Sequence, residues 1–231
     1  MNRRPMSTIL GILALAGMLV APYFALIYAS VEKEQKLAQK IFYFHVPSAW
    51  VSFLGFFIVF VASVLYLWKK ERIYDLWASA AAEVGVLFCT LVLLTGPIWA
   101  KPIWNAWWVW DARLTTTLVL WLIYVAYLML RSYGGDAAQN AKFRAVLGIV
   151  GFLDVPLIYE SVNIWRTLHP PQLIRKGGLQ ADMFEALMVC LTAFTALFLA
   201  LLFQRVSLAR AEEELATIRA DLQERETSPT P

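Results

Sequence analysis

The sequence predicts an all-α integral membrane protein with six transmembrane helices. Of its 231 residues, 60% are hydrophobic and only 16% are charged, and the mean hydropathy is +0.59. A soluble domain of this size has too little interior to hide so much apolar surface from water. Six apolar runs, separated by polar connectors, are long enough to cross a bilayer. The net charge of only +3 indicates no role in binding nucleic acid.

The first predicted span is an uncharged run from Met6 to Val31. It is longer than the apolar core of a signal peptide, so we expect it to be retained as a membrane helix. Gly17 and Pro22 lie within this run and favour a kink. A polar connector over residues 32–40 separates it from the next apolar run.

The second span is expected from about Pro47 to Trp68, because proline suits the first turn of a helix. His45 precedes it and is therefore expected at a membrane surface. The third span is expected from about Ala78 to Trp99, with Glu83 near its start, and the fourth from about Leu114 to Leu130.

The fifth span is expected from about Ala145 to Tyr159 and contains Asp154, a deep acid that needs a partner. The sixth is expected from about Met183 to Phe203. We divide the chain into a six-span membrane domain, residues 1–205, and a polar cytoplasmic tail, residues 206–231. The tail forms either a short amphipathic helix or a solvated charged end, since its leucines recur every seven residues, at Leu208, Leu215 and Leu222.

Six spans place both termini on the same side of the membrane. Of the 20 lysines and arginines, twelve lie on the side of the termini and eight on the other. Because cytoplasmic segments carry the excess of positive charge, we predict cytoplasmic termini. The only two histidines, His45 and His169, then share the outer face with the tryptophan-rich segment between the third and fourth spans. The two cysteines, Cys89 and Cys190, lie in apolar runs and are interpreted as buried structural thiols.

Five of the ten tryptophans lie in residues 98–115. If this segment is helical from Trp104, then Trp104, Trp107, Trp108 and Asp111 share one helix face, which predicts a short interfacial tryptophan-rich helix on the outer face. One interpretation is a membrane anchor, because tryptophan favours the membrane–water boundary. The other is a platform for a flat ligand. Asp111 is interpreted either as the cap of the fourth span or as a partner of Arg113.

Two histidines and an aromatic platform on one membrane face suggest haem. Neutral imidazole is a good axial ligand for iron, and aromatic rings pack against the flat macrocycle. The cations available for its propionates are Arg113, Arg175, Lys176 and Lys101. Each histidine has a second, simpler interpretation as a solvated or capping residue of a loop, and the sequence does not exclude it.

The segment Trp104–Thr115 resembles the tryptophan-rich WWD motif of bacterial haem-handling proteins, and most nearly that of the haem exporter protein C family of cytochrome c maturation. Phe44–Ala49, and Ser161-Val162 through Thr167–His169, agree with the same family. The similarity extends to about residue 205. Asn105 stands where the family usually has glycine.

This resemblance implies a multi-pass protein of the bacterial inner membrane that holds haem at the periplasmic face and delivers it to a periplasmic haem chaperone. The implied cargo is haem b, bound transiently. The implied partners are the chaperone cytochrome c maturation protein E, the ATPase and permease subunits of an ABC transporter, a small single-span protein and the lipid bilayer. The implied axial ligands are His45 and His169. The full set of predicted haem-binding residues is His45, His169, Trp104, Trp107, Trp108, Trp110, Asp111 and Arg113.

We expect no enzyme activity beyond possible assistance in attaching haem covalently to the chaperone, because the chain has no phosphate-binding loop and no catalytic constellation. An alternative function is a membrane b-type haem protein that transfers electrons. That function normally needs haems in both leaflets, whereas two histidines allow one bis-histidine haem at most. A transporter using Asp154 and Glu83 is a third hypothesis, for which no inverted repeat is evident.

Overall fold

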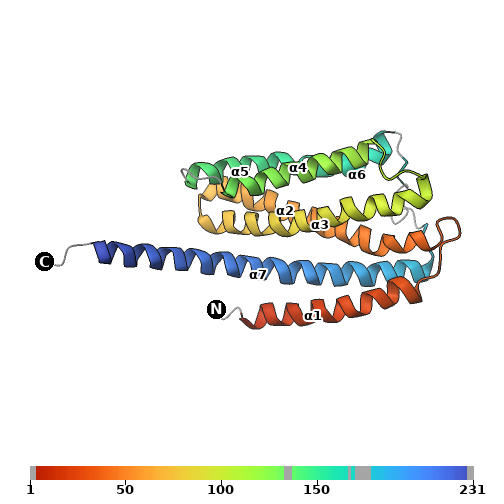
Figure 1. Ribbon diagram of the computed structural model, residues 1–231, viewed down its shortest axis with the longest axis horizontal. Helices are drawn as coiled ribbons and strands as arrows, with labels where there is room; N and C mark the ends of the chain where they lie inside the picture. The colour runs from red at the N-terminus through yellow and green to blue at the C-terminus, as the bar shows by residue number, and fades with distance from the viewer. Residues whose placement is uncertain (1–3, 133–136, 166–167, 170–177, 228–231) are drawn as a thin grey trace.

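The computed structural model describes residues 4–132, 137–165, 168–169 and 178–227. These residues form a bundle of long helices that run side by side (Figure 1). In chain order the elements are α1 (Arg4–Tyr23), the π-helical turn η1 (Phe24–Tyr28), the 3-10 turn η2 (Leu37–Ile41), α2 (Phe42–Lys69), α3 (Arg72–Trp104), α4 (Ala112–Ser132), α5 (Ala137–Phe152), α6 (Asp154–Ile164) and α7 (Ala181–Thr227).

Six segments of the described chain are long and apolar enough to cross a membrane, which confirms the six predicted spans. The ribbon begins and ends at the same end of the bundle, here called the inner end (Figure 1). The opposite end, here called the outer end, carries η2, the connection from α3 to α4 and the start of α7. The six segments are Ser7–Tyr28, Leu37–Lys69, Arg72–Trp104, Ala112–Arg131, Ala138–Ile164 and Ala181–Gln223.

The first span changes its helical form near its outer end. Pro22 lies inside α1, and the α-helix gives way to the π-helical turn η1 at Phe24. Proline has no N–H to donate and its ring crowds the preceding turn, so a change of helical pitch close to it is expected. The kink predicted from Gly17 and Pro22 thus corresponds to an α-to-π transition.

The second span starts five residues earlier than predicted. Helix α2 begins at Phe42, directly after the 3-10 turn η2, so Pro47 is its sixth residue. His45 therefore lies in the first turns of the helix and not before it, as the sequence had led us to expect. A helical backbone fixes the direction of the His45 side chain more firmly than a loop would.

The fifth span is broken into two helices. Pro156 cannot donate the hydrogen bond that would close a turn on the carbonyl of Phe152, and α5 ends at Phe152. Leu153 instead donates to Val150 O at 3.2 Å, and α6 starts at Asp154. The Oδ2 atom of Asp154 is buried and has no hydrogen-bond partner among the described residues. The deep acid noted in the sequence thus sits at a helix break.

Close backbone contact joins α2 to α3 at the centre of the bundle. A Cβ atom on Gly55 would lie 3.1 Å from the Cα of Gly85 and 3.2 Å from the carbonyl oxygen of Ala81. Small residues at such a crossing let helices in a membrane approach closely. Beside it, the rings of Phe56 and Tyr124 stack with centroids 3.8 Å apart. This packing holds the two helices that present His45 and its neighbours.

Ion pairs fasten the inner end. Arg144 Nη2 on α5 lies 2.8 Å from both carboxylate oxygens of Asp75 on α3, and both side chains are buried. Arg72 also pairs with Asp75 and reaches Glu213 of α7, with Nε 2.7 Å from Oε1. The charged groups of this end therefore bind one another across three helices.

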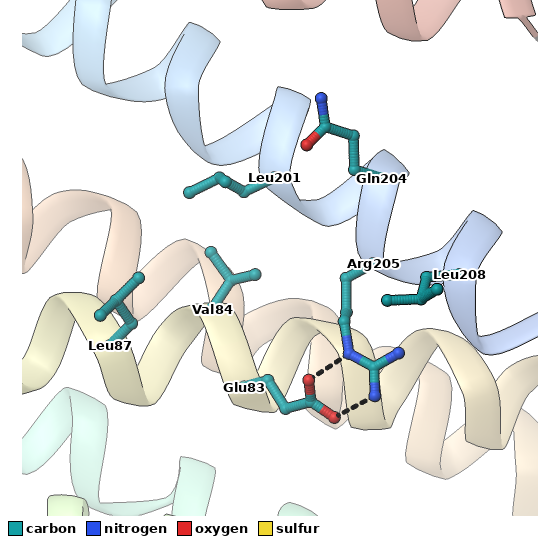
Figure 2. A pocket seen from close by; sticks show the side chains of 7 residues that line it. All are labelled: Glu83, Val84, Leu87, Leu201, Gln204, Arg205 and Leu208. Carbon is teal, nitrogen blue, oxygen red and sulfur yellow. Dashed lines mark hydrogen bonds and ion pairs between the residues drawn. The ribbon is translucent and has the colours of Figure 1, made fainter.

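Glu83 is held by two arginines rather than lying free in the membrane. Arg131 Nη1 and Arg205 Nη2 each lie 3.0 Å from Glu83 Oε1. A pocket of about 330 Å³ opens next to this group between α3 and α7, as Figure 2 shows. It lies towards the inner end, away from both histidines. The pocket is lined by Glu83, Val84, Leu87, Leu201, Gln204, Arg205 and Leu208.

Helix α7 continues through the predicted tail. Its 47 residues run without a break from Ala181 to Thr227, well beyond the other helices at the inner end (Figure 1). The sequence left two interpretations of the tail, a short amphipathic helix and a solvated charged end. Residues 206–227 are helical. Four apolar side chains on this extension are each 54% exposed, and they follow a heptad pattern: Leu208, Leu215, Ile218 and Leu222. Both cysteines, Cys89 and Cys190, are buried free thiols, as predicted.

Candidate functional site

The segments that carry the two histidines and the tryptophans meet at the outer end of the bundle. His45 lies at the start of α2, residues 105–111 connect α3 to α4, and His169 lies between α6 and α7. The chain passes through the outer end at each of these places (Figure 1). Span count predicted that His45, His169 and the tryptophan-rich segment share one side of the membrane. In the structure all three lie at the outer end of the bundle.

His45 is partly buried and is held by α3. Its Nδ1 lies 2.9 Å from the hydroxyl of Thr95, and that hydroxyl donates to the carbonyl of Leu91 at 2.7 Å. The imidazole ring also meets the ring of Trp99 edge-on, with centroids 5.6 Å apart. The indole N–H of Trp99 in turn donates to Gln35 Oε1 at 3.0 Å. A hydrogen bond and an aromatic contact therefore fix the imidazole of His45 in place.

His169 is held by Arg113, the second residue of α4. Arg113 Nη1 lies 3.3 Å from His169 Nδ1. The other nitrogens of the guanidinium bind α6: Nη2 donates to the carbonyl of Tyr159 at 2.9 Å, and Nε donates to the hydroxyl of Ser161 at 3.3 Å. One arginine thus ties together α4, α6 and the segment that carries His169.

The outer end brings together groups from distant parts of the chain. His45 lies on α2, Arg113 on α4, and His169 between α6 and α7. No single helix could bring His45 and His169 together, since 124 positions separate them in the sequence.

The tryptophan-rich segment is not the short helix that we predicted. Helix α3 extends to Trp104, Asn105 adopts a left-handed conformation with φ 53° and ψ 21°, and residues 106–111 are irregular. Trp104, Trp107, Trp108 and Asp111 therefore do not share a helix face. A left-handed residue ends a helix, and glycine or asparagine adopts this conformation most readily. Asparagine at position 105 is compatible with this geometry.

The tryptophans of this segment line the surface without forming a flat shelf. Trp107 is 58% exposed and Trp110 is 77% exposed. Trp108 is partly buried and meets Trp110 edge-on, with ring centroids 5.6 Å apart. The indole nitrogen of Trp108 is buried and has no hydrogen-bond partner among the described residues. Aromatic surface is thus exposed at the outer end.

Asp111 caps α4, which confirms the structural interpretation of this residue. Its Oδ1 accepts a hydrogen bond from the backbone N–H of Leu114 at 2.9 Å, and its carbonyl accepts from the N–H of Thr115 at 3.0 Å. Such a cap satisfies donors that a helix start leaves without partners. Arg113 therefore lies in the first turn of α4, directly after the tryptophan-rich segment. Lys101, another candidate cation, donates to Asn105 O and Oδ1, each at 3.2 Å.

Four residues contribute to this site to which the sequence assigned no role. Thr95 and Trp99 hold His45, and Tyr159 and Ser161 hold Arg113. Trp99 and Ser161 lie in segments that the sequence marked, but their contacts depend on which helices become neighbours. The remaining candidate cations, Arg175 and Lys176, lie outside the described residues.

These features define a helical, multi-pass membrane protein with two histidines, exposed tryptophans and an arginine at one end of its bundle. The chain belongs to the Heme exporter protein C family, which matches residues 2–221.

Relatives from several organisms agree with this assignment. Heme exporter protein C of Bradyrhizobium diazoefficiens is 39% identical over 171 residues, which are 73% of this chain and 65% of that protein. Heme exporter protein C of Haemophilus influenzae is 32% identical over 213 residues, 90% of this chain and 86% of that protein. A putative cytochrome c biosynthesis ccmC-like mitochondrial protein of Marchantia polymorpha is 37% identical over 159 residues, 69% of this chain and 67% of that protein.

The match thus spans about two thirds of the length of the Bradyrhizobium and Marchantia proteins and most of the Haemophilus protein. With its six membrane-spanning helices and its bacterial relatives, the chain is a multi-pass protein of the inner membrane.

Proposed function

We propose that this protein handles haem in cytochrome c biogenesis: it binds haem b at the periplasmic face of the inner membrane and delivers it to a periplasmic haem chaperone. The observation that carries the proposal is the placement of the chain's only two histidines at one end of the bundle, each held by a side-chain hydrogen bond. Imidazole is a common axial ligand of haem iron, and such ligands are usually oriented by a second hydrogen bond.

The residues at the outer end suit haem chemically. His45 and His169 are the axial ligands in this proposal. Trp107 and Trp110 offer exposed aromatic surface for the macrocycle, and the buried N–H of Trp108 is a donor without a partner among the described residues. Arg113 is a partly buried cation suited to a propionate carboxylate. Haem is the cargo here, so the chain's own task is to hold, orient and release it.

The proposal includes partners that act with this chain. The family resemblance supports a periplasmic haem chaperone, cytochrome c maturation protein E, as the recipient. It also supports ATPase and permease subunits of an ABC transporter and a small single-span membrane protein. In this proposal the chain is not itself an enzyme, and the energy of ATP hydrolysis is supplied by a partner. The outer end faces the periplasm, as the distribution of lysine and arginine favours.

Electron transfer by a b-type haem is the alternative function. It normally requires haems towards both faces of the membrane, and both histidines of this chain lie at the same end. The bundle therefore favours haem handling over electron transfer.

The test is the haem content and visible spectrum of the purified protein and of His45→Gly and His169→Gly, each with and without imidazole. We expect each single variant to lose one axial ligand, and added imidazole to restore the spectrum by filling the vacated position. The double variant should lose tight haem binding while still inserting into the membrane. Unchanged spectra in both single variants would contradict the assignment of the axial ligands.

A further inference from the structure

Helix α3 contacts the imidazole of His45 at three positions within about one helical turn. The hydroxyl of Thr95 lies 2.9 Å from Nδ1, and the ring of Trp99 meets the imidazole edge-on, with centroids 5.6 Å apart. Between them, Gly96 faces Cε1, since a Cβ atom added to this glycine would lie 3.5 Å from that carbon. Because Thr95 binds Nδ1, Nε2 is the ring nitrogen that is placed to bind iron.

The orientation of this imidazole is fixed, because both of its side-chain neighbours on α3 are themselves held. The hydroxyl of Thr95 donates to a backbone carbonyl one turn back at 2.7 Å. The indole N–H of Trp99 donates to Gln35 Oε1 at 3.0 Å, and its ring meets that of Phe42 edge-on, with centroids 6.1 Å apart. The fold therefore determines which edge of the imidazole faces Gly96.

Gly96 differs from the glycines that let the helices pack closely. At Gly55, Gly85 and Gly148 an added Cβ would lie 2.9–3.1 Å from an atom of a neighbouring helix. At Gly96 the nearest such atom is Cε1 of His45 at 3.5 Å, an ordinary van der Waals distance, and among the described residues no other atom outside its own stretch of helix lies within 4 Å. Glycine is less favourable than alanine inside a helix, and close packing does not require it here.

The proline that follows does not require glycine either. A proline ring crowds the Cβ of the residue before it when that residue is helical, so Pro97 could favour a glycine at position 96. The same helix, however, carries Lys101 directly before Pro102, and that lysine is helical with its side chain in place. The space at Gly96 thus has no explanation in the packing or the backbone of α3.

Such a space is what an axial ligand needs. An imidazole that binds iron through Nε2 turns the two carbons next to that nitrogen, Cε1 and Cδ2, towards the macrocycle, because the macrocycle lies across the iron–nitrogen bond. Groups that crowd Cε1 therefore compete with the macrocycle for room. At His45, a side chain on residue 96 would be such a group, and glycine leaves that room open.

We propose that Gly96 is a haem-contact residue: the edge of the macrocycle lies against the backbone of α3 at this glycine, beside Cε1 of His45. This inference rests on the proposed haem-handling function and adds to it a contact on the helix before the tryptophan-rich segment. Thr95 and Trp99 are positioning residues, since they hold His45 in the orientation that keeps Cε1 next to this space.

The first test compares two glycine-to-leucine variants. Gly96→Leu fills the space beside Cε1, whereas Gly11→Leu adds the same side chain to α1, where an added Cβ meets no atom within 4 Å. We expect Gly96→Leu to weaken haem binding by about 10–100-fold, the range for changes around a metal ligand. Its spectrum should be five-coordinate and high-spin, because His45 no longer reaches the iron. Gly11→Leu should bind haem like the wild type.

The second test does not depend on the folding of the leucine variant. Gly96→Cys places a small thiol at the same point, where a Cβ is only in ordinary contact, and the two native thiols are buried. We expect methyl methanethiosulfonate to modify the introduced thiol in haem-free protein, and added haem to protect it. Gly11→Cys is the matched control, and its rate of modification should be the same with and without haem.

A wild-type affinity and a six-coordinate spectrum in Gly96→Leu would overturn the proposal, as would equal modification of Gly96→Cys with and without haem. Failure of the wild-type protein to bind haem would instead contradict the proposed function, on which this inference rests.

Discussion

At the scale of single residues, the loop between α3 and α4 is defined by two side chains. Asn105 ends α3 in a left-handed conformation, and Asp111 starts α4 by capping it. Asparagine and aspartate are the residue types that favour these two places. The sequence predicted the cap at Asp111, whereas the end of α3 at Asn105 was not predicted. The helical periodicity of the tryptophans between them was the weaker signal and led to the wrong prediction.

Asp111→Ala should lower the free energy of unfolding by about 1 kcal/mol, because the helix start loses its side-chain acceptor. Asp111→Asn keeps an acceptor at the same position and should retain both stability and haem content. Denaturant unfolding in detergent, together with haem content, checks the pair. If Asp111→Asn were stable but lost haem, the carboxylate would have a direct role in binding haem beyond the cap.

The structural context of the histidines was predictable only in part. Span count placed His45 and His169 at one end of the bundle, and the bundle agrees. Arg113 was among the predicted site residues, but its contact with His169 and that of Thr95 with His45 could not be read from the sequence, because these partners come from helices that are distant along the chain. Tertiary neighbours of this kind become known only when the packing of the helices is known.

At the scale of elements, the tryptophan-rich segment still has two interpretations, membrane anchor and haem platform. Trp110→Ala separates them when compared with Trp68→Ala, since both side chains are 77% exposed and Trp68 lies at the inner end of α2. We expect Trp110→Ala to reduce bound haem, by analogy with the about 1–3 kcal/mol that aromatic stacking on a flat base contributes. Trp68→Ala should leave haem content unchanged.

Both variants should accumulate in the membrane to the wild-type level, as immunoblots of membrane fractions would show. Equal haem content in the two variants, with reduced accumulation of Trp110→Ala, would favour the anchor.

The spans themselves were the most predictable elements, because a run of apolar residues long enough to cross a bilayer has few other stable structures. Their ends were less predictable. Helix α2 starts before Pro47, and the fifth span breaks at Leu153, where Pro156 removes a backbone donor. The helix α7 exceeds its predicted span because the polar tail is itself helical.

At the scale of the whole molecule, buried ions fasten the inner end while hydrogen bonds organise the outer end. Asp75→Asn should destabilise the fold by about 3–5 kcal/mol, because it leaves Arg144 charged and buried without its partner. Glu213→Gln is the matched control: its pair with Arg72 is partly exposed and should contribute no more than about 1 kcal/mol. Thermal unfolding of both variants in detergent checks the difference, and equal losses would contradict it.

We predict the orientation of the bundle in the membrane from the distribution of its lysines and arginines. Reporter fusions at Gly135 and at both termini should give cytoplasmic signals, and fusions at Lys101 and Arg175 should give periplasmic signals. A cytoplasmic signal at Lys101 would contradict a shared site at the periplasmic face.

The uninterrupted length of α7 has a mechanical consequence. At 1.5 Å per residue, its 47 residues form a rod of about 70 Å. Near the outer end of this rod, Asp182 accepts from the backbone N–H of Ser30 at 2.7 Å and Glu185 from the hydroxyl of Tyr28 at 2.5 Å. Its other end extends past the bundle. The same unbroken helix thus carries polar contacts at the outer end and ion pairs with α3 at the inner end, so it connects the two sides of the membrane in one piece.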